Sequence, residues 1–98
     1  VLLIGDFNAA AAGNRAYDIL TDGNVFTDTW IRAKERRGDG LGTFNDFKAI
    51  PRDGRRIDWI LARGDVMVSR TEIVTNAPAG QFPSDHFPVV AWLRLTAR

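Results

Sequence analysis

The sequence is most informative about its fold at Arg55-Arg56-Ile57-Asp58-Trp59-Ile60-Leu61. In an extended chain, successive side chains point to opposite faces, so Ile57, Trp59 and Leu61 share one face. Asp58 lies on the other face, between apolar neighbours. The stretch is therefore predicted to form a strand with one face in the core and a carboxylate on its opposite face.

Further strands are predicted on both sides of this stretch. The continuous apolar run Val1–Ile4, which ends at Gly5, is typical of a buried strand that leads into a loop. Residues 51–54, Pro-Arg-Asp-Gly, indicate a turn because Pro fixes φ and Asp-Gly tolerates tight geometry. Downstream, β-branched segments predict strands around Val66 and Val68, over 71–75 and over 89–95, with a Pro-containing loop at 78–88.

Two short helices are predicted between the first strand and residue 55. Asn14 can cap the first one, and Gly23 suits the position just past its end. Its apolar face would consist of Ala16, Tyr17, Ile19 and Leu20. Residues 25–33 carry apolar side chains at roughly helical spacing, whereas the three glycines within 36–42 indicate a flexible loop. The fold class is therefore α/β or α+β, with mostly antiparallel strands and one or two short helices.

The composition is that of one ordinary folded domain. The 98 residues are 45% hydrophobic and 26% charged, which is close to the globular average. The apolar runs fall far short of the roughly 18 to 20 residues that a membrane helix needs. Because cysteine is absent, disulfides, thiolate zinc sites and cysteine nucleophiles are excluded, and the cellular compartment stays unknown.

The formal net charge of +1 is too small to argue for a broad nucleic-acid-binding surface. Basic residues nevertheless gather in two clusters. These are Arg32, Lys34, Arg36 and Arg37 in the first, and Arg52, Arg55 and Arg56 in the second. Solvated loop and helix faces explain both clusters, and the alternative is that they bind a phosphate-rich ligand such as a nucleic acid.

The first candidate for chemistry is Gly5-Asp6-Phe7-Asn8. In an extended segment Asp6 and Asn8 point to the same side, which places a carboxylate beside an amide. A carboxylate can orient or deprotonate water, and an amide can donate a hydrogen bond to an oxyanion. The alternative is a loop of Asx turns, in which both side chains bond to their own backbone.

The second candidate is Asp58 together with His86, the only histidine. A carboxylate in the middle of a strand needs a partner if it is buried. Arg55 or Arg56 could form a structural salt bridge with it, or His86 could donate a hydrogen bond to it. The histidine pairing would fix the ring tautomer and favour the protonated form. Asp85 would then point elsewhere, toward a hard cation or water, while His86 reaches a phosphate oxygen.

These side chains limit the metal chemistry that the chain can support. One histidine without cysteine cannot build a zinc site of nitrogen and sulfur ligands. Carboxylate and amide oxygens favour Mg²⁺ or Mn²⁺ instead. Neither a Gly-Lys-Ser/Thr phosphate loop nor a Gly-x-Ser-x-Gly nucleophile elbow occurs, so nucleotide-loop and serine-hydrolase interpretations are excluded.

Taken in order, five motifs resemble the second half of the endonuclease/exonuclease/phosphatase superfamily. They are Gly5-Asp6-Phe7-Asn8, Asp28-Thr29-Trp30, Gly42-Thr43-Phe44, Arg56-Ile57-Asp58-Trp59-Ile60 and Ser84-Asp85-His86-Phe87-Pro88-Val89. The resemblance implies a four-layer α/β/β/α sandwich, of which this chain would be the C-terminal half. It also implies a metal-dependent phosphoesterase that hydrolyses a phosphodiester or phosphomonoester, a group that includes nucleases.

The resemblance implies a role for each candidate residue. Asp6 would activate the attacking water and help to bind the metal, and Asn8 would stabilise the pentacovalent phosphorus. Asp58 would orient His86, and His86 would contact the scissile phosphate. Asp85 would bind the divalent cation, Mg²⁺ or Mn²⁺. A non-catalytic binding module that retains the fold is the alternative.

The resemblance also predicts that residues 1–98 form only part of a domain. The upstream half of the family domain carries an Asn, a metal-binding Glu and a further His or Tyr, and none has a counterpart here. We therefore expect the chain alone to be inactive, and to expose an apolar face or to self-associate. The expected substrate is a nucleic acid, a phospholipid head group or a small phosphate ester, contacted by residues 32–37 and 80–83.

Overall fold

The computed structural model describes residues 1–95, which form two three-stranded sheets and two short α-helices. The first sheet has the order β1 (Leu2–Asp6), β4 (Asp58–Ala62), β2 (Thr27–Asp28). The second has the order β3 (Glu35–Arg37), β5 (Val66–Ile73), β6 (Val89–Leu95). The helices are α1 (Arg15–Thr21) and α2 (Thr29–Arg32), and 3₁₀ turns span Asp22–Asn24 and Pro78–Gly80. The predicted α+β class is confirmed.

The alternating stretch forms a strand, as predicted, although the strand begins at Asp58 rather than at Arg55. It is the central strand of the first sheet. β4 pairs antiparallel with β1 and with β2. Trp59 and Leu61 are buried, and Trp59 stacks on Phe7 with ring centroids 4.3 Å apart. Tyr17 of α1 meets the same indole ring edge-on at 5.3 Å. One face of β4 therefore holds the aromatic contact that joins α1 to the sheet.

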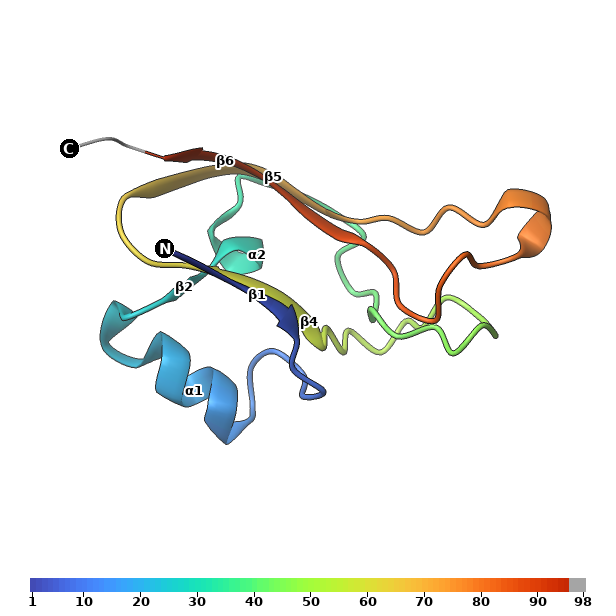
Figure 1. Cartoon of the computed structure of the whole chain (residues 1–98), viewed down its shortest axis with the longest axis horizontal. Helices are drawn as coiled ribbons and strands as arrows, with labels where there is room; N and C mark the ends of the chain where they lie inside the picture. Colours follow the sequence, from blue (N-terminus) through green and yellow to red (C-terminus); the bar gives the residue numbers. More distant parts are fainter. Residues whose placement is uncertain (96–98) are drawn as a thin grey trace.

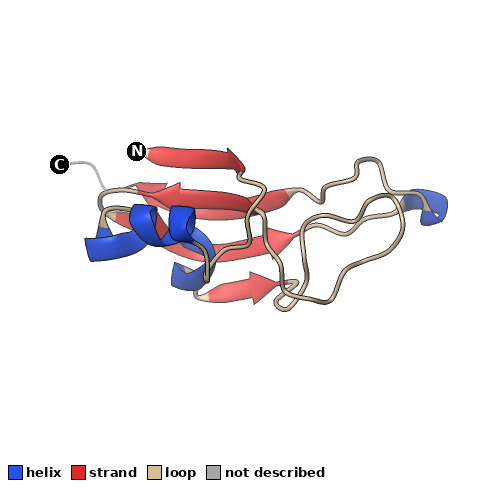
Figure 2. Cartoon of the chain, turned by 90° about the horizontal axis from the view of Figure 1, so that it is seen from below, coloured by secondary structure: helices blue, strands red, loops and turns tan. Residues whose placement is uncertain are grey.

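The layers follow one another in a simple order. Figure 1 shows α1 on the outer side of the first sheet, with β5 and β6 on the opposite side of that sheet, and Figure 2 shows α1 in front of the strands when the molecule is seen from below. A core of Trp30, Ile73 and Phe87 lies between the two sheets. Because Trp30 belongs to α2, this one-turn helix fills space between the two sheets rather than covering an outer face.

The helices differ from the prediction in two details. Asn14 caps α1 as expected, since its side-chain oxygen accepts a hydrogen bond of 2.9 Å from the Tyr17 N–H. Ala16 and Ile19, however, were wrongly placed on the buried face, because both are exposed, Ile19 to 62%. The helix predicted over 25–33 is shorter than expected. Residues 27–28 pair with β4 as β2, and only Thr29–Arg32 is helical.

Strand β3 was not expected, because its sequence lies where glycines and charges indicated a loop. It pairs parallel with β5, whereas β5 and β6 pair antiparallel with a register shift between Val68 and Arg70. The remaining strands lie close to their predicted ranges, and β6 coincides with 89–95. Within the described residues, no helix is long and apolar enough to cross a membrane.

Several large apolar side chains are exposed. On β1, Leu2 is 41% and Ile4 63% exposed, and among the strands of residues 1–95 this strand pairs only with β4. On the second sheet, Met67 and Trp92 are 50% and 39% exposed. Both sheets therefore expose single large apolar side chains, while the expected apolar face and self-association stay predictions.

Candidate functional site

Two acidic residues of the candidate site come from neighbouring strands. Asp6 is the last residue of β1, and Asp58 is the first residue of β4. The antiparallel register pairs these two positions directly. Their side chains therefore leave the same end of the sheet on the same face, because paired residues share a face. The side chain of Asp6 is 41% exposed and that of Asp58 only 20%.

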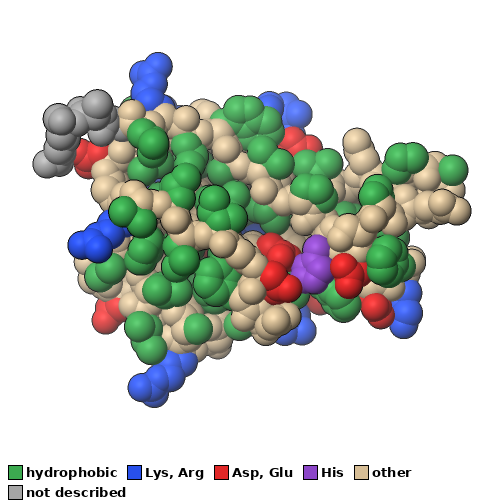
Figure 3. All heavy atoms as spheres, viewed as in Figure 1, with side chains coloured by type: hydrophobic (Ala, Val, Ile, Leu, Met, Phe, Trp, Pro, Cys, Tyr) green, Lys and Arg blue, Asp and Glu red, His purple; other side chains and the backbone are tan. Residues whose placement is uncertain are grey.

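His86 lies between these two carboxylates. Its Nδ1 atom is 2.9 Å from Oδ2 of Asp58, and its Nε2 atom is 3.6 Å from Oδ2 of Asp6. The predicted pairing of Asp58 with His86 is thus confirmed over the alternative pairing with Arg55 or Arg56. Figure 3 shows the single histidine, in purple, at the surface with acidic groups, in red, beside it.

The surroundings of His86 favour its charged form. The hydrogen bond with Asp58 raises the pKa of His86 above its ordinary value of 6.5, and partial burial of the ring opposes this. The negative charges of Asp58, Asp6 and Asp85 raise the pKa further. With Nδ1 bonded to Asp58, the ring presents Nε2 on the side of Asp6 as a donor for an anionic ligand.

Asn8 does not follow the extended geometry assumed from the sequence. The strand ends at Asp6, and Asn8 has φ 53°, in the left-handed region that asparagine tolerates. Its backbone N–H donates a hydrogen bond of 2.9 Å to Oδ1 of Asp6. The Asx-turn alternative is therefore the local conformation. This turn still leaves Oδ2 of Asp6 directed at His86, so the turn and the site are compatible.

Asp85 lies beside His86 in the sequence, but its carboxylate is not part of the Asp6, Asp58 and His86 group. Its backbone oxygen accepts hydrogen bonds from the N–H groups of Asn45 and Asp46, at 2.7 and 3.3 Å. The buried Asn45 side chain also donates to the Ser84 oxygen at 3.0 Å. The loop that carries Asp85 and His86 is therefore held in place by hydrogen bonds from the backbone and side chain of Asn45.

The side chains of the candidate site include donors that suit a divalent cation. One atom each from Asp6, Asp58 and His86 lie within 4.8 Å of one another, and Asp6 is exposed. Two carboxylates and one imidazole can bind a divalent cation, and the oxygens suit Mg²⁺ or Mn²⁺. Because Asp58 is engaged by His86, Asp6 is the carboxylate of this group that is open to a cation.

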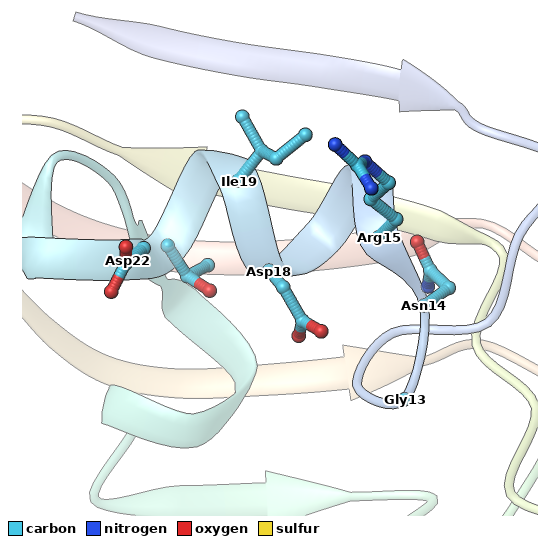
Figure 4. Close-up of a pocket in the computed structure, with 7 residues that line it drawn as sticks. Gly13, Asn14, Arg15, Asp18, Ile19 and Asp22 are labelled. Atoms are coloured by element: carbon cyan, nitrogen blue, oxygen red, sulfur yellow. The ribbon is translucent and has the colours of Figure 1, made fainter.

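Hollows in the surface support this location only in part. A shallow hollow of about 590 Å³ lies along α1 and is lined by Asn14, Arg15 and Asp18 among others, as Figure 4 shows. None of the predicted site residues lines it. A smaller hollow of about 280 Å³ is lined by Asp6 and Asp58. His86 lines a separate hollow of about 120 Å³. We place the site where Asp6, Asp58 and His86 meet, between these two hollows, because the paired ionisable groups are there.

One polar network was missed by the sequence analysis. Asp28 is buried, and its Oδ2 accepts hydrogen bonds of 2.8 Å from the Tyr17 hydroxyl and from Nη2 of Arg56. Burial, and then Asp28, raise the pKa of Tyr17. The motif Asp28-Thr29-Trp30 was noted in the sequence, but its partners are 11 and 28 residues away. The only signal in the sequence was that a buried Asp28 would need a hydrogen-bond donor such as Arg56 or Tyr17.

The two basic clusters are partly structural. Arg56 is buried against Asp28. Arg36 donates hydrogen bonds from Nη1 to the oxygens of Trp30 and Ala33, at 3.3 and 3.1 Å, and so caps the end of α2. Nε of Arg37 lies 3.4 Å from Oε1 of Glu35. The expected solvated face is therefore wrong for Arg56, which is buried. Arg36 and Arg37 make local contacts that need no nucleic acid.

Comparisons with known proteins identify the family of the chain. Residues 1–86 match the Endonuclease/Exonuclease/phosphatase family. Among solved structures, a mannosyl-6-phosphatase from Bacteroides thetaiotaomicron VPI-5482 is 30% identical, with a TM-score of 0.83, over 96% of this chain and 37% of its own. A family member from Bacteroides vulgatus is 34% identical, with a TM-score of 0.79, over 97% of this chain and 36% of its own.

A conserved protein of unknown function from Enterococcus faecalis V583 is 30% identical, with a TM-score of 0.77, over 95% of this chain and 35% of its own. The chain thus spans 35–37% of the length of these three structures. No curated protein matches it significantly. The family match extends from β1 to His86 and includes every residue of the candidate site, so the chain belongs to the endonuclease/exonuclease/phosphatase family.

Proposed function

We propose that residues 1–98 are the C-terminal part of a metal-dependent phosphoesterase domain that hydrolyses a phosphodiester or phosphomonoester. The observation that supports this most is the meeting of Asp6, Asp58 and His86 at one end of the first sheet. Membership of a family that includes phosphatases and nucleases supports the same reaction class. Water would attack phosphorus, the phosphorus–oxygen ester bond would break, and the alcohol would leave.

His86 and Asp58 would act as a pair in this reaction. The hydrogen bond from Nδ1 to Asp58 fixes the ring, and the raised pKa keeps it protonated over a wider pH range. A protonated ring can donate from Nε2 to an oxygen of the scissile phosphate. Charge that builds up on the phosphate oxygens in the transition state would be stabilised there by the donor.

Asp6 would orient and deprotonate the attacking water through its carboxylate, which is exposed and lies 3.6 Å from Nε2 of His86. Asn8 would donate to an oxygen of the pentacovalent phosphorus from the turn that begins at Asp6. Asp6 and Asp85 would hold Mg²⁺ or Mn²⁺, which supplies positive charge to the phosphate oxygens when bound. The chain covers about a third of its relatives, so further ligands would come from outside it.

The substrate is proposed to be a phosphate ester of a small molecule. One similar structure is that of a mannosyl-6-phosphatase, which makes a sugar phosphate the first compound to test. The net charge of +1 and the structural use of Arg36 and Arg56 argue against a polyanionic nucleic acid as the substrate. Residues 32–37 and 80–83 remain the segments where we expect contacts with the alcohol group.

The test is Mg²⁺-dependent hydrolysis of a sugar phosphate and of a generic phosphodiester by the complete protein that contains residues 1–98. The chain itself is assayed beside it, with His86→Ala and the exposed Arg63→Ala as variants. We expect turnover by the complete protein and by Arg63→Ala that is lost with chelator and with His86→Ala. A well-folded complete protein without turnover on either ester would instead favour a non-catalytic module of the same fold.

A further inference from the structure

The three segments that carry Asp6, Asp58 and His86 are joined by hydrogen bonds made by residues next to these side chains. Phe7 N–H, next to Asp6, donates to the Ile57 oxygen at 2.8 Å. Ile57, next to Asp58, donates its own N–H to the Thr43 hydroxyl at 3.0 Å. The Thr43 backbone oxygen, in turn, accepts the N–H of Phe87, the residue after His86, at 2.8 Å.

Thr43 therefore bonds directly to the segments that carry Asp58 and His86, and the segment that carries Asp6 joins them through Ile57. The Thr43 side chain is fully buried, with 0% exposure. Its N–H donates to the Arg55 oxygen at 3.2 Å, so it contacts the 55–57 segment through both backbone and side chain. The hydroxyl matters most, since it is the acceptor for the Ile57 N–H immediately before Asp58.

The preceding glycine allows this close approach. A Cβ atom on Gly42 would lie 2.6 Å from Oδ1 of Asp53 and 3.0 Å from Cγ of Pro51. A side chain at this position would displace the Asp53 carboxylate and press on Pro51. The Gly42 N–H donates to the Pro51 oxygen at 2.9 Å. The backbone at Gly42 and Thr43 thus lies directly against the turn that leads into β4, which holds the start of that strand in place.

We propose that Thr43 is a positioning residue, which sets the alignment of Asp58 with His86 through its hydroxyl and its backbone oxygen. The inference deepens the proposed function, on which its catalytic meaning rests. Loss of the hydroxyl frees the Ile57 N–H and allows the start of β4 to shift. The hydrogen bond between Nδ1 of His86 and Asp58 is then lengthened or broken, although no catalytic group has been altered.

The experiment measures the ring N–H resonance of His86 by proton NMR in the 98-residue chain, at a fixed pH and without metal. A proton shared between a ring nitrogen and a carboxylate is strongly deshielded and protected from exchange, so it gives its own downfield signal. His86 is the only histidine, which makes the assignment unambiguous. The variants are Thr43→Val, which removes the hydroxyl at nearly constant shape, and Thr43→Ser, which keeps it.

Thr71→Val provides a matched control. Thr71 is 1% exposed, and its hydroxyl has no hydrogen-bond partner among the described residues. The same chemical change is therefore made at a second buried threonine that has no link to the site. Circular dichroism and thermal unfolding of each variant establish that it is folded before its histidine signal is compared.

We expect the downfield signal to be lost or moved upfield in Thr43→Val and to be kept in Thr43→Ser and Thr71→Val. A folded Thr43→Val with the wild-type signal would overturn the proposal. If Thr43→Val does not fold, the serine variant decides, because a folded Thr43→Ser without the signal also overturns it. The measurement needs no turnover, so its outcome is separate from success or failure of the proposed hydrolysis.

Discussion

Nη2 of Arg56 lies 2.8 Å from Oδ2 of Asp28, and the two side chains are only 9% and 3% exposed. The Trp30 N–H donates to the other carboxylate oxygen at 2.9 Å, and the Tyr17 hydroxyl shares Oδ2. One carboxylate therefore connects α1, the start of α2 and the segment before β4. Arg56 lies two residues before Asp58, so this buried ion pair also fixes the backbone that leads into Asp58 and β4.

Replacement of Arg56 by methionine is expected to destabilise the chain by about 3–5 kcal/mol, because it leaves the buried carboxylate of Asp28 without its cation. Urea unfolding measures the change. The matched control is Arg55→Met, one position away and exposed, for which a change within about 0.5 kcal/mol is expected. Equal effects of the two substitutions would show that the Arg56 ion pair contributes nothing specific.

The pKa of His86 is expected to lie above 6.5, since the Asp58 hydrogen bond and nearby acidic groups favour the charged ring. NMR titration of the ring protons measures it directly. Asp58→Asn removes the negative charge and leaves only a weaker, neutral hydrogen-bond acceptor, so it should lower this pKa. Asp85→Asn removes only the weakest of the contributing charges and should lower it less. An equal decrease in both variants would contradict the assignment of the hydrogen bond as the main cause.

The same shift makes the stability of the chain depend on pH. Because the folded-state pKa of His86 is raised, its contribution is fully present below about 6.5, the unfolded value, and is lost as pH rises through the folded pKa. Urea midpoints measured at several pH values should therefore fall across this window. The fall should be smaller in Asp58→Asn than in the wild type, and an unchanged pH profile would count against the coupling.

Much of the first sheet could be predicted from the sequence because its signals are local. The alternation around Trp59 and the apolar run before Gly5 define two strands within one or two residues of their ends, apart from residues 55–57. Of these residues, Arg55 and Ile57 bond to Thr43, and Ile57 also bonds to Phe7, instead of joining the sheet. The pairing of Asp58 with His86 could also be predicted, because a carboxylate between apolar strand neighbours needs a partner and His86 is the only histidine.

The missed features depend on contacts that no local pattern encodes. β3 consists of Glu35–Arg37, which has no strand propensity and is held by parallel pairing with β5. Arg56 was assigned to a surface cluster because its partner Asp28 is distant in sequence. Ile19 was placed in the core by helical spacing alone, yet α1 has only seven residues and contacts the sheet through Tyr17.

Mn²⁺ is expected to bind at Asp6 and to broaden the amide signals of Asp6, Asp58 and His86 before those of α1, because the ion is paramagnetic. Chelator should restore the signals. Asp6→Asn and Asp85→Asn should each raise the Mn²⁺ concentration needed for broadening, whereas Asp18→Asn, an exposed acid on α1, should not. An unchanged midpoint in Asp85→Asn would remove Asp85 from the ligand set and leave Asp6 as the cation site.

Self-association through β1 is expected, because this strand exposes Ile4 and, among the described strands, pairs only with β4. A free, apolar strand edge is a template for pairing with another chain, and a lysine on it opposes such pairing. Sedimentation velocity over a range of concentrations should show oligomers of the wild type that Ile4→Lys dissociates. Ile19→Lys is the control, since Ile19 is equally exposed, at 62% against 63%, but lies on a helix. A wild-type chain that stays monomeric at every concentration, or equal effects of both lysines, would show that the edge of β1 is not the contact.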